Sequence, residues 1–177
     1  MKLIFGALKG FAILAIVLVA IAFLLPSEVS VSRTTVIAAP ADDIFPHVNS
    51  MQATQDWSPW LSRDADVELV YEGPEQGVGN TLRWMSDQPD VGNGIQVITA
   101  STENERVETA LDFGPQGLAN AYIDLEPVDG GTQVTWGFDT KLGMNPMARW
   151  MGLMFDGWIG KDYEVGLANL KALVEGG

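Results

Sequence analysis

The chain has 177 residues, with 10 Lys and Arg against 23 Asp and Glu, one His and no Cys. This length gives room for one folded domain of ordinary size. The lack of Cys excludes disulfide scaffolds, thiolate zinc sites, iron–sulfur clusters and cysteine nucleophiles. The net charge of −13 argues against nucleic-acid binding, because phosphate contacts need clustered Lys and Arg.

The apolar excess of the chain lies in residues 1–26. Only one charge, Lys9, falls between residues 3 and 25, and residues 11–25 are apolar without interruption. A membrane-spanning helix needs about 20 mostly apolar residues. Residues 23–26, at the end of the apolar segment, are bulky and lack the small residues of a signal-peptide cleavage site. We therefore expect an uncleaved transmembrane anchor. Because Lys2 and Lys9 precede the span, we expect a single-pass protein of the cytoplasmic membrane with its N-terminus in the cytoplasm and its domain in the periplasm or outside.

Residues 27–177 are the predicted folded domain, with a net charge of −15. A β-branched stretch from Val29 to Ile37 predicts a first strand, and Asp42 and Asp43 begin a short helix with an apolar face. Six further strand signals follow, separated by turn-forming residues, at 67–71, 80–85, 95–101, 106–113, 121–126 and 133–140. Because short turns join antiparallel strands, the sequence predicts an antiparallel sheet of about seven strands.

One long helix is predicted from Pro146 to Glu175, beginning at a proline and ending before Gly176 and Gly177. Apolar side chains form one stripe that we expect to pack on the sheet, at residues 155, 159, 163, 167, 170 and 174. The first half of the helix is apolar on nearly all sides, which predicts that it has partners on all sides.

Four segments carry a resemblance to a known family: residues 39–45, the Trp57-Ser58-Pro59-Trp60 loop, residues 130–136 and residues 160–171. Together with the order of the elements, they resemble the START/Bet v 1-like (SRPBCC) superfamily, and most of all its membrane-anchored bacterial members of polyketide cyclase/dehydrase type. The resemblance implies an α+β helix-grip fold, in which a curved antiparallel sheet wraps around the C-terminal helix and leaves a cavity. It implies no single activity, since the superfamily includes carriers, cyclases and cofactor chaperones.

Large apolar side chains are the main binding candidates. Trp offers a rigid face and Met an adaptable one, which together suit irregular hydrophobic ligands, although core packing explains them equally well. We expect the cavity to be lined by Trp57, Trp60, Trp84, Met151, Met154, Phe155 and Trp158, with Arg83 available to an anionic head group. Contact of the apolar first half of the long helix with a bilayer is the other interpretation of that segment.

Catalytic candidates are few. His47 is a conceivable general base, and Asp112 and Asp124 on strands are conceivable inward carboxylates. A surface role explains the three better, since no Ser, Cys or second His supports a nucleophile arrangement. One His also makes a metal site improbable, and we expect neither a metal nor a cofactor.

The sequence therefore predicts a membrane-tethered domain that binds a small hydrophobic or lipid-like molecule between sheet and helix. One alternative is a cyclase or hydrolase-type enzyme that uses an inward carboxylate or His47. Another is a non-catalytic interaction module of the cell envelope with a filled core. The polarity of the cavity lining discriminates between the first two functions, because an enzyme of this type needs a deep carboxylate that touches His47 or an Arg.

Overall fold

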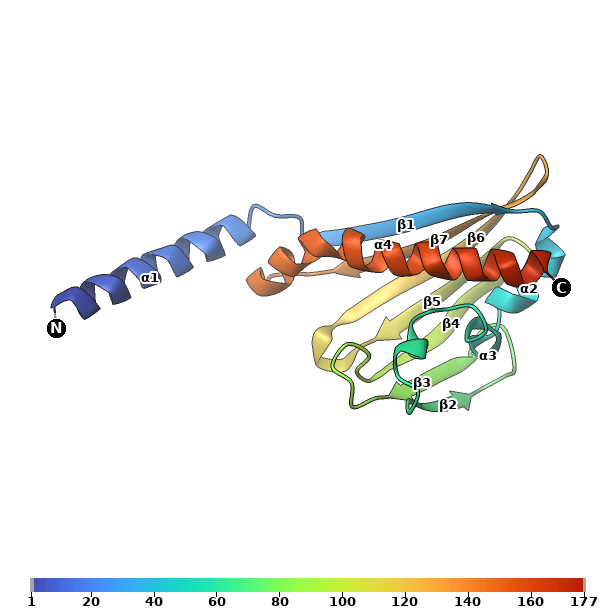
Figure 1. Cartoon of the computed structure of the whole chain (residues 1–177), viewed down its shortest axis with the longest axis horizontal. Coiled ribbons are helices and arrows are strands. Elements are labelled where there is room, and N and C mark those ends of the chain that lie inside the picture. The colour runs from blue at the N-terminus through green and yellow to red at the C-terminus, as the bar shows by residue number, and fades with distance from the viewer. Residues whose placement is uncertain (1, 177) are drawn as a thin grey trace.

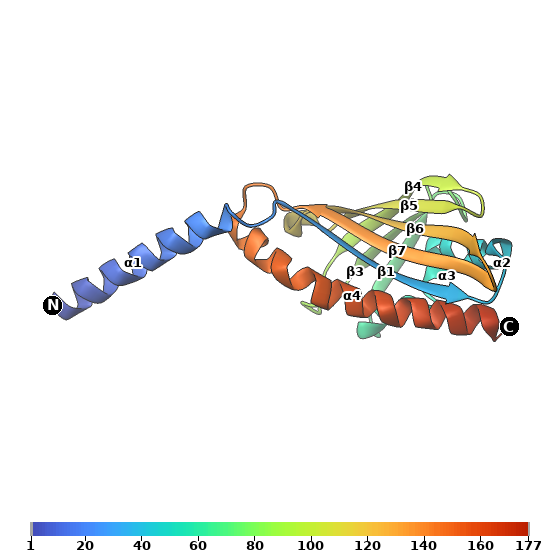
Figure 2. The ribbon, with the colours of Figure 1, turned by 90° about the horizontal axis from the view of Figure 1, so that it is seen from above.

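The protein consists of an N-terminal helix that extends away from an α+β domain (Figures 1 and 2). The structure is a computed structural model that describes residues 2–176. Helix α1 (Lys2–Ala22) covers the apolar segment, and most of its described side chains are exposed, as are Leu8 and Phe11. Within the described residues, no helix reaches the combination of length and apolar character needed to cross a membrane. The predicted transmembrane helix is therefore not confirmed.

A seven-stranded antiparallel sheet forms the body of the domain. Its strands lie in the order β1-β7-β6-β5-β4-β3-β2, so six consecutive strands form a meander and β1 pairs with the last of them. The chain crosses from one edge of the sheet to the other through helices α2 (Ala41–Val48) and α3 (Met51–Thr54). The predicted sheet is confirmed, with the strands β1 (Glu28–Ile37), β2 (Glu68–Glu72), β3 (Thr81–Met85), β4 (Gly94–Thr102), β5 (Arg106–Asp112), β6 (Leu118–Val128) and β7 (Gly131–Lys141).

The two faces of the sheet differ in polarity because side chains alternate along a strand. In β6, Ala119, Ala121, Ile123 and Leu125 are buried on one side, here called the inner face. The residues between them point to the outer face, where Asp124 pairs with Arg106 of β5. A sheet that is apolar on one face and polar on the other is typical of antiparallel sheets packed on one side only.

The main core lies between the inner face and the second half of helix α4 (Pro146–Glu175), which confirms the predicted long helix. The ring of Trp136 on β7 stacks on Tyr163 of α4, with centroids 3.8 Å apart and an interplanar angle of 7°. Trp57 is 1% exposed and meets Trp136 edge-on at 4.9 Å. Its indole Nε1 donates to the carbonyl of His47 at 2.9 Å, which fixes the loop that carries it.

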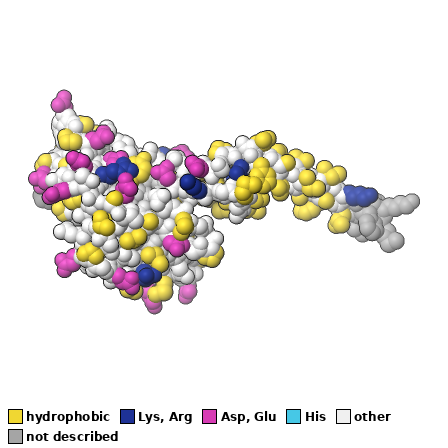
Figure 3. Space-filling model, turned by 180° about the vertical axis from the view of Figure 1, so that it is seen from behind, with side chains coloured by type: hydrophobic (Ala, Val, Ile, Leu, Met, Phe, Trp, Pro, Cys, Tyr) yellow, Lys and Arg dark blue, Asp and Glu magenta, His cyan; other side chains and the backbone are white. Residues whose placement is uncertain are grey.

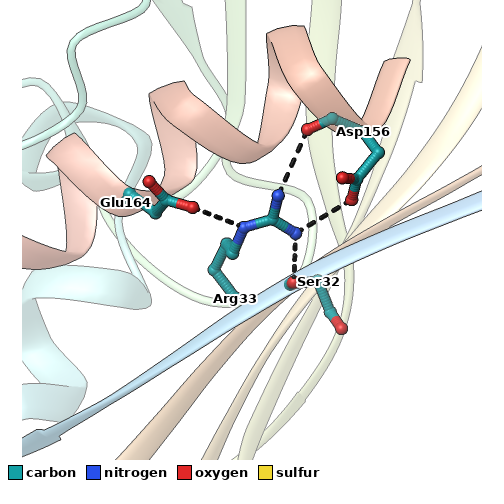
Figure 4. A network of polar contacts seen from close by, with 4 residues as sticks. All are labelled: Ser32, Arg33, Asp156 and Glu164. Carbon is teal, nitrogen blue, oxygen red and sulfur yellow. Dashed lines mark hydrogen bonds and ion pairs between the residues drawn. The ribbon is translucent and has the colours of Figure 1, made fainter. Parts of the chain in front are cut away.

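Arg33 on β1 joins the edge of the sheet to the middle of α4 (Figure 4). Its Nε donates to Glu164 at 2.7 Å, and its Nη atoms donate to the carboxylate and the carbonyl of Asp156 at 3.0 and 3.2 Å. Gly160 leaves the space for this guanidinium, since a Cβ there would collide with it. The hydrogen bonds to Asp156 and Glu164 raise the pKa of Arg33, and the same contact lowers the pKa of Asp156.

Arg149, in the first turns of α4, joins this helix to the end of α1. The side chain is 8% exposed, and its Nη1 donates to the carbonyls of Ala22 at 3.5 Å, Phe23 at 3.2 Å and Leu25 at 3.2 Å. The last carbonyls of a helix have no partner within it, and a cation is favoured there by the helix dipole. The guanidinium therefore binds the chain at and just after the end of α1 and holds this end of the helix against α4.

Candidate ligand-binding region

The candidate site is a group of apolar side chains between the sheet and the first half of α4. Phe155 of α4 faces Phe138 of β7, with ring centroids 6.5 Å apart and an interplanar angle of 77°. Around this pair, several side chains are only partly buried, so solvent reaches them. The group, called the second apolar cluster below, consists of Leu111, Phe113, Ala119, Trp136, Phe138, Phe155, Ile159 and Tyr163.

Small and polar residues form the part of the inner face next to this cluster. Ala119 and Ala121 stand on β6 and are each 6% exposed. On the neighbouring strands, Nε2 of Gln96 donates to Oγ1 of Thr109 at 3.0 Å, and Thr109 donates to the carbonyl of Ala121 at 3.5 Å. Neither of these bonds uses the amide oxygen of Gln96, which is an acceptor by its chemistry. A few such polar groups in an apolar lining are typical of small-molecule sites.

The predicted aromatic residues divide between core and surface. Phe155 belongs to the second apolar cluster, whereas Trp57 and Trp84 are only 1% and 3% exposed within the main core. Trp60 is partly buried against that core, and the guanidinium of Arg63 lies 5.1 Å from its ring centre. Of these four residues, therefore, only Phe155 lies where sheet and helix leave apolar side chains partly open.

The other predicted lining residues point elsewhere. Met151, Met154 and Trp158 are 42%, 45% and 52% exposed, on the side of α4 that is turned away from the sheet. Arg83 lies on the outer face, where its Nε donates to Glu72 at 3.0 Å. Arg83 and Trp84 therefore lie on opposite faces of the sheet, because neighbouring residues of a strand point to opposite sides.

The three catalytic candidates are not brought together. His47 lies at the end of α2 and contributes its carbonyl to Trp57. Asp112 accepts the backbone N–H of Gly114 at 2.8 Å, and Asp124 accepts from Arg106 on the outer face at 2.5 Å. Their described hydrogen bonds link none of the three to another. Within the described residues, no group of three or more metal-binding side chains occurs.

Two cavities of the described structure are open to solvent and have mixed polar and apolar linings. One, of about 430 Å³, lies between α2 and the turn after β4 and is lined by Asp42, Phe45, Pro46, Asn49, Gln76, Ser101, Glu103 and Asn104. The other, of about 310 Å³, is lined by Thr99, Arg106, Glu108, Thr109, Asn120, Ala121, Tyr122 and Asp139. Neither includes a residue of α4, so the predicted cavity between sheet and helix is not one of them. The second apolar cluster is a partly open surface.

A long C-terminal helix held by a curved, one-sided antiparallel sheet defines the helix-grip class of α+β proteins. Within this class, the chain belongs to the family of polyketide cyclases/dehydrases and lipid transport proteins, whose family model matches residues 28–175. The resemblance seen in the sequence is thereby confirmed at the level of the family. No curated protein matches significantly.

Solved structures show the same fold at low identity. An uncharacterised protein from Rhizobium leguminosarum is 16% identical, with a TM-score of 0.58, and the match covers 85% of this chain and 96% of that one. Ara h 8.0201 is 14% identical, with a TM-score of 0.58 and coverages of 85% and 99%. The di-domain aromatase/cyclase StfQ of the steffimycin biosynthetic pathway is 13% identical, with a TM-score of 0.62, and the match covers 84% of this chain and 51% of StfQ.

Proposed function

We propose that the domain binds a small hydrophobic or lipid-like molecule at the second apolar cluster. The observation that carries this proposal is the pair of partly buried apolar surfaces there, one on the inner face and one on the first half of α4. Binding would come from burial of apolar area, at about 25 cal/mol per Å². The amide oxygen of Gln96 would fix the orientation of a ligand that carries a donor.

The family description includes lipid transport beside cyclase and dehydrase, so it is compatible with binding. The contacts of the catalytic candidates favour binding over acid–base catalysis. Asp112 accepts from the backbone N–H of Gly114 and Asp124 pairs with Arg106, and no described hydrogen bond joins either carboxylate to His47. The alternative function, an interaction module with a filled core, predicts that the domain takes up no amphiphile.

The test uses residues 27–177 and a dansyl-labelled undecanoic acid whose fluorescence rises in an apolar site. Phe155→Glu places a charge in the second apolar cluster, and we expect it to weaken binding at least about tenfold, since burying an unpaired charge costs more than 1.4 kcal/mol. Val165→Glu is the matched control, because Val165 is 50% exposed on the same helix about three turns later. Circular dichroism checks that both variants are folded. Equal affinity in the two variants would place the probe elsewhere, and no binding to the parent domain would favour the filled-core module.

We further propose that α1 attaches the domain to the cytoplasmic membrane, with the domain on the periplasmic or outer side. Residues 11–25 are uninterruptedly apolar, and side chains such as Phe11 and Ile16, 73% and 69% exposed, have no cover in the described domain. Lys2 and Lys9 lie on the side expected to face the cytoplasm.

Carbonate extraction of membranes from a bacterial host tests the attachment, and C-terminal fusions test the orientation. We expect the full chain to stay in the extracted membranes. The fusion to alkaline phosphatase should be active, and the fusion to green fluorescent protein should not fluoresce. Release of the full chain by carbonate would contradict the attachment. A bright fluorescent fusion with an inactive phosphatase would contradict the orientation.

A further inference from the structure

Four large apolar side chains form an exposed row along the first half of α4. Met147, Met151, Met154 and Trp158 are 68%, 42%, 45% and 52% exposed. Their spacing of 4, 3 and 4 residues places them on one side of the helix. This row is called the methionine stripe below. Exposed apolar side chains that gather on one surface mark a site of interaction.

The side chains of the stripe itself carry no charge. Between residues 142 and 155 the only charged residue is Arg149, which is buried at the junction with α1, and exposed charges begin with Asp156 and Lys161 at the far end of the stripe. Elsewhere the domain is strongly acidic, and Figure 3 shows acidic side chains over the globular part while apolar side chains continue along α1. The occupant of the stripe is therefore apolar and is recognised without ion pairs.

The position of the stripe beside α1 identifies this occupant. Nε1 of Trp150 donates to the carbonyl of Leu18 at 3.2 Å. Leu18 lies four residues before Ala22, which is about 6 Å along the helix axis. The first turns of α4 thus lie beside the last two turns of α1, at the end of the domain where α1 joins it (Figures 1 and 2). Whatever surrounds the end of α1 also surrounds these turns of α4.

We propose that the methionine stripe lies in the interfacial layer of the bilayer and contacts the upper part of the lipid acyl chains. The inference rests on the proposed attachment of α1 to the membrane. Methionine side chains adapt to irregular apolar surroundings, and tryptophan is enriched at membrane interfaces. Because the stripe carries no Lys or Arg, its insertion depends on apolar area and needs no attraction to anionic lipid.

The stripe also connects the bilayer with the candidate ligand region. The ring of Trp158 lies 6.5 Å from that of Phe155, and Phe155 belongs to the second apolar cluster. An amphiphile could therefore pass from the acyl chains to this cluster along apolar side chains. The ligand of the domain would then be a membrane component.

Single-cysteine labelling tests the proposal, since the chain has no Cys of its own. The full chain is reconstituted into vesicles of phosphatidylcholine, with the fluorophore NBD attached at Val17→Cys, Met151→Cys, Met154→Cys or Ala168→Cys. Lipids with a nitroxide near the head of the acyl chain serve as quenchers. Ala168 is the matched control, because it is exposed on α4 about 21 Å beyond Met154.

We expect quenching of about half of the fluorescence at positions 17, 151 and 154 and little at 168. The same result is expected when a fifth of the lipid is phosphatidylglycerol. Quenching at 17 without quenching at 151 and 154 would overturn the inference and leave the attachment of α1 intact. No quenching at 17 would overturn both, and equal quenching at 154 and 168 would show that the domain lies flat on the membrane without a dedicated surface.

Discussion

Replacing Arg149 by Met should release α1 from the domain. The Met side chain keeps the aliphatic part of the packing and removes the guanidinium. The loss in the free energy of docking follows from the contacts of Nη1. Two of its bonds, to Phe23 and Leu25, are 3.2 Å long, and the bond to Ala22, at 3.5 Å, is too long to count.

A hydrogen bond from a charged donor contributes about 1.5–3 kcal/mol at good geometry, so we take about 1 kcal/mol for each of the two at the long end of the range. The dipole at the end of α1 adds about 0.5 kcal/mol. The Phe23 ring, whose centre lies 5.4 Å from the guanidinium carbon, adds about as much. The sum is about 3 kcal/mol, which corresponds to a loss of about 100-fold in the equilibrium constant for docking.

Double electron–electron resonance tests this docking, because it measures the distribution of distances between nitroxide labels at Leu14→Cys and Val36→Cys. Both positions are exposed, at 55% and 42%. In reconstituted parent protein we expect one narrow distance distribution, and in Arg149→Met a broad one. Arg83→Met, which removes an exposed guanidinium from the outer face, is the control and should leave the distribution narrow. A narrow, unchanged distribution in Arg149→Met would refute the role of this residue in docking α1.

The remaining predictions concern the stability of the domain. Gly94→Ala should lower the free energy of unfolding by about 1–3 kcal/mol, because its Cβ would collide with the buried ring of Trp84 and a backbone carbonyl. Gly157→Ala, with nothing within 4 Å, should raise it by up to about 1 kcal/mol, and urea denaturation showing the opposite order would contradict the packing at Gly94. Hydrogen bonds from Arg33 to Asp156 and from a backbone N–H to Glu175 lower the pKa of both carboxyls. The contribution of these carboxylates to folding stability is therefore complete above their unfolded pKa values, 3.8 and 4.5, and is lost as the pH falls through the lower folded values. The difference in melting temperature between the parent and a double variant, Asp156→Asn with Glu175→Gln, should shrink below about pH 4. A difference that stays constant with pH would exclude these contacts.

The sheet and the long helix were predictable because their signals are local. Alternating apolar residues separated by Gly, Pro, Asn and Asp specify short strands and turns, and the stripe through Tyr163 and Leu167 specifies the packed side of α4. The same period of two could have excluded Arg83 from the cavity, since its neighbour Trp84 was assigned to the same lining. The pair of Gln96 and Thr109 was missed, because it forms between two strands whose register a sequence does not show.

Residues in the first half of α4 illustrate where the sequence alone is insufficient. Phe155 and Met154 are adjacent and both apolar, yet only Phe155 faces the sheet. Which of them is covered depends on how far the sheet extends beneath the helix, and this is fixed by contacts distant in sequence such as Arg33 with Asp156. The junction of Arg149 with α1 joins residues more than 120 positions apart and has no local signal.

The sequence by itself determined the family, the antiparallel sheet, the long C-terminal helix and the apolar character of the first 26 residues, because periodicity, turn chemistry and composition act over short distances. The tertiary structure alone decided which apolar residues became core and which became surface. It buried Trp57 and Trp84 in the main core, left the methionine stripe exposed beside α1, and separated His47 from Asp112 and Asp124. Burial is a property of all the elements that surround a side chain, so the same residue type can fill a core or present a binding surface.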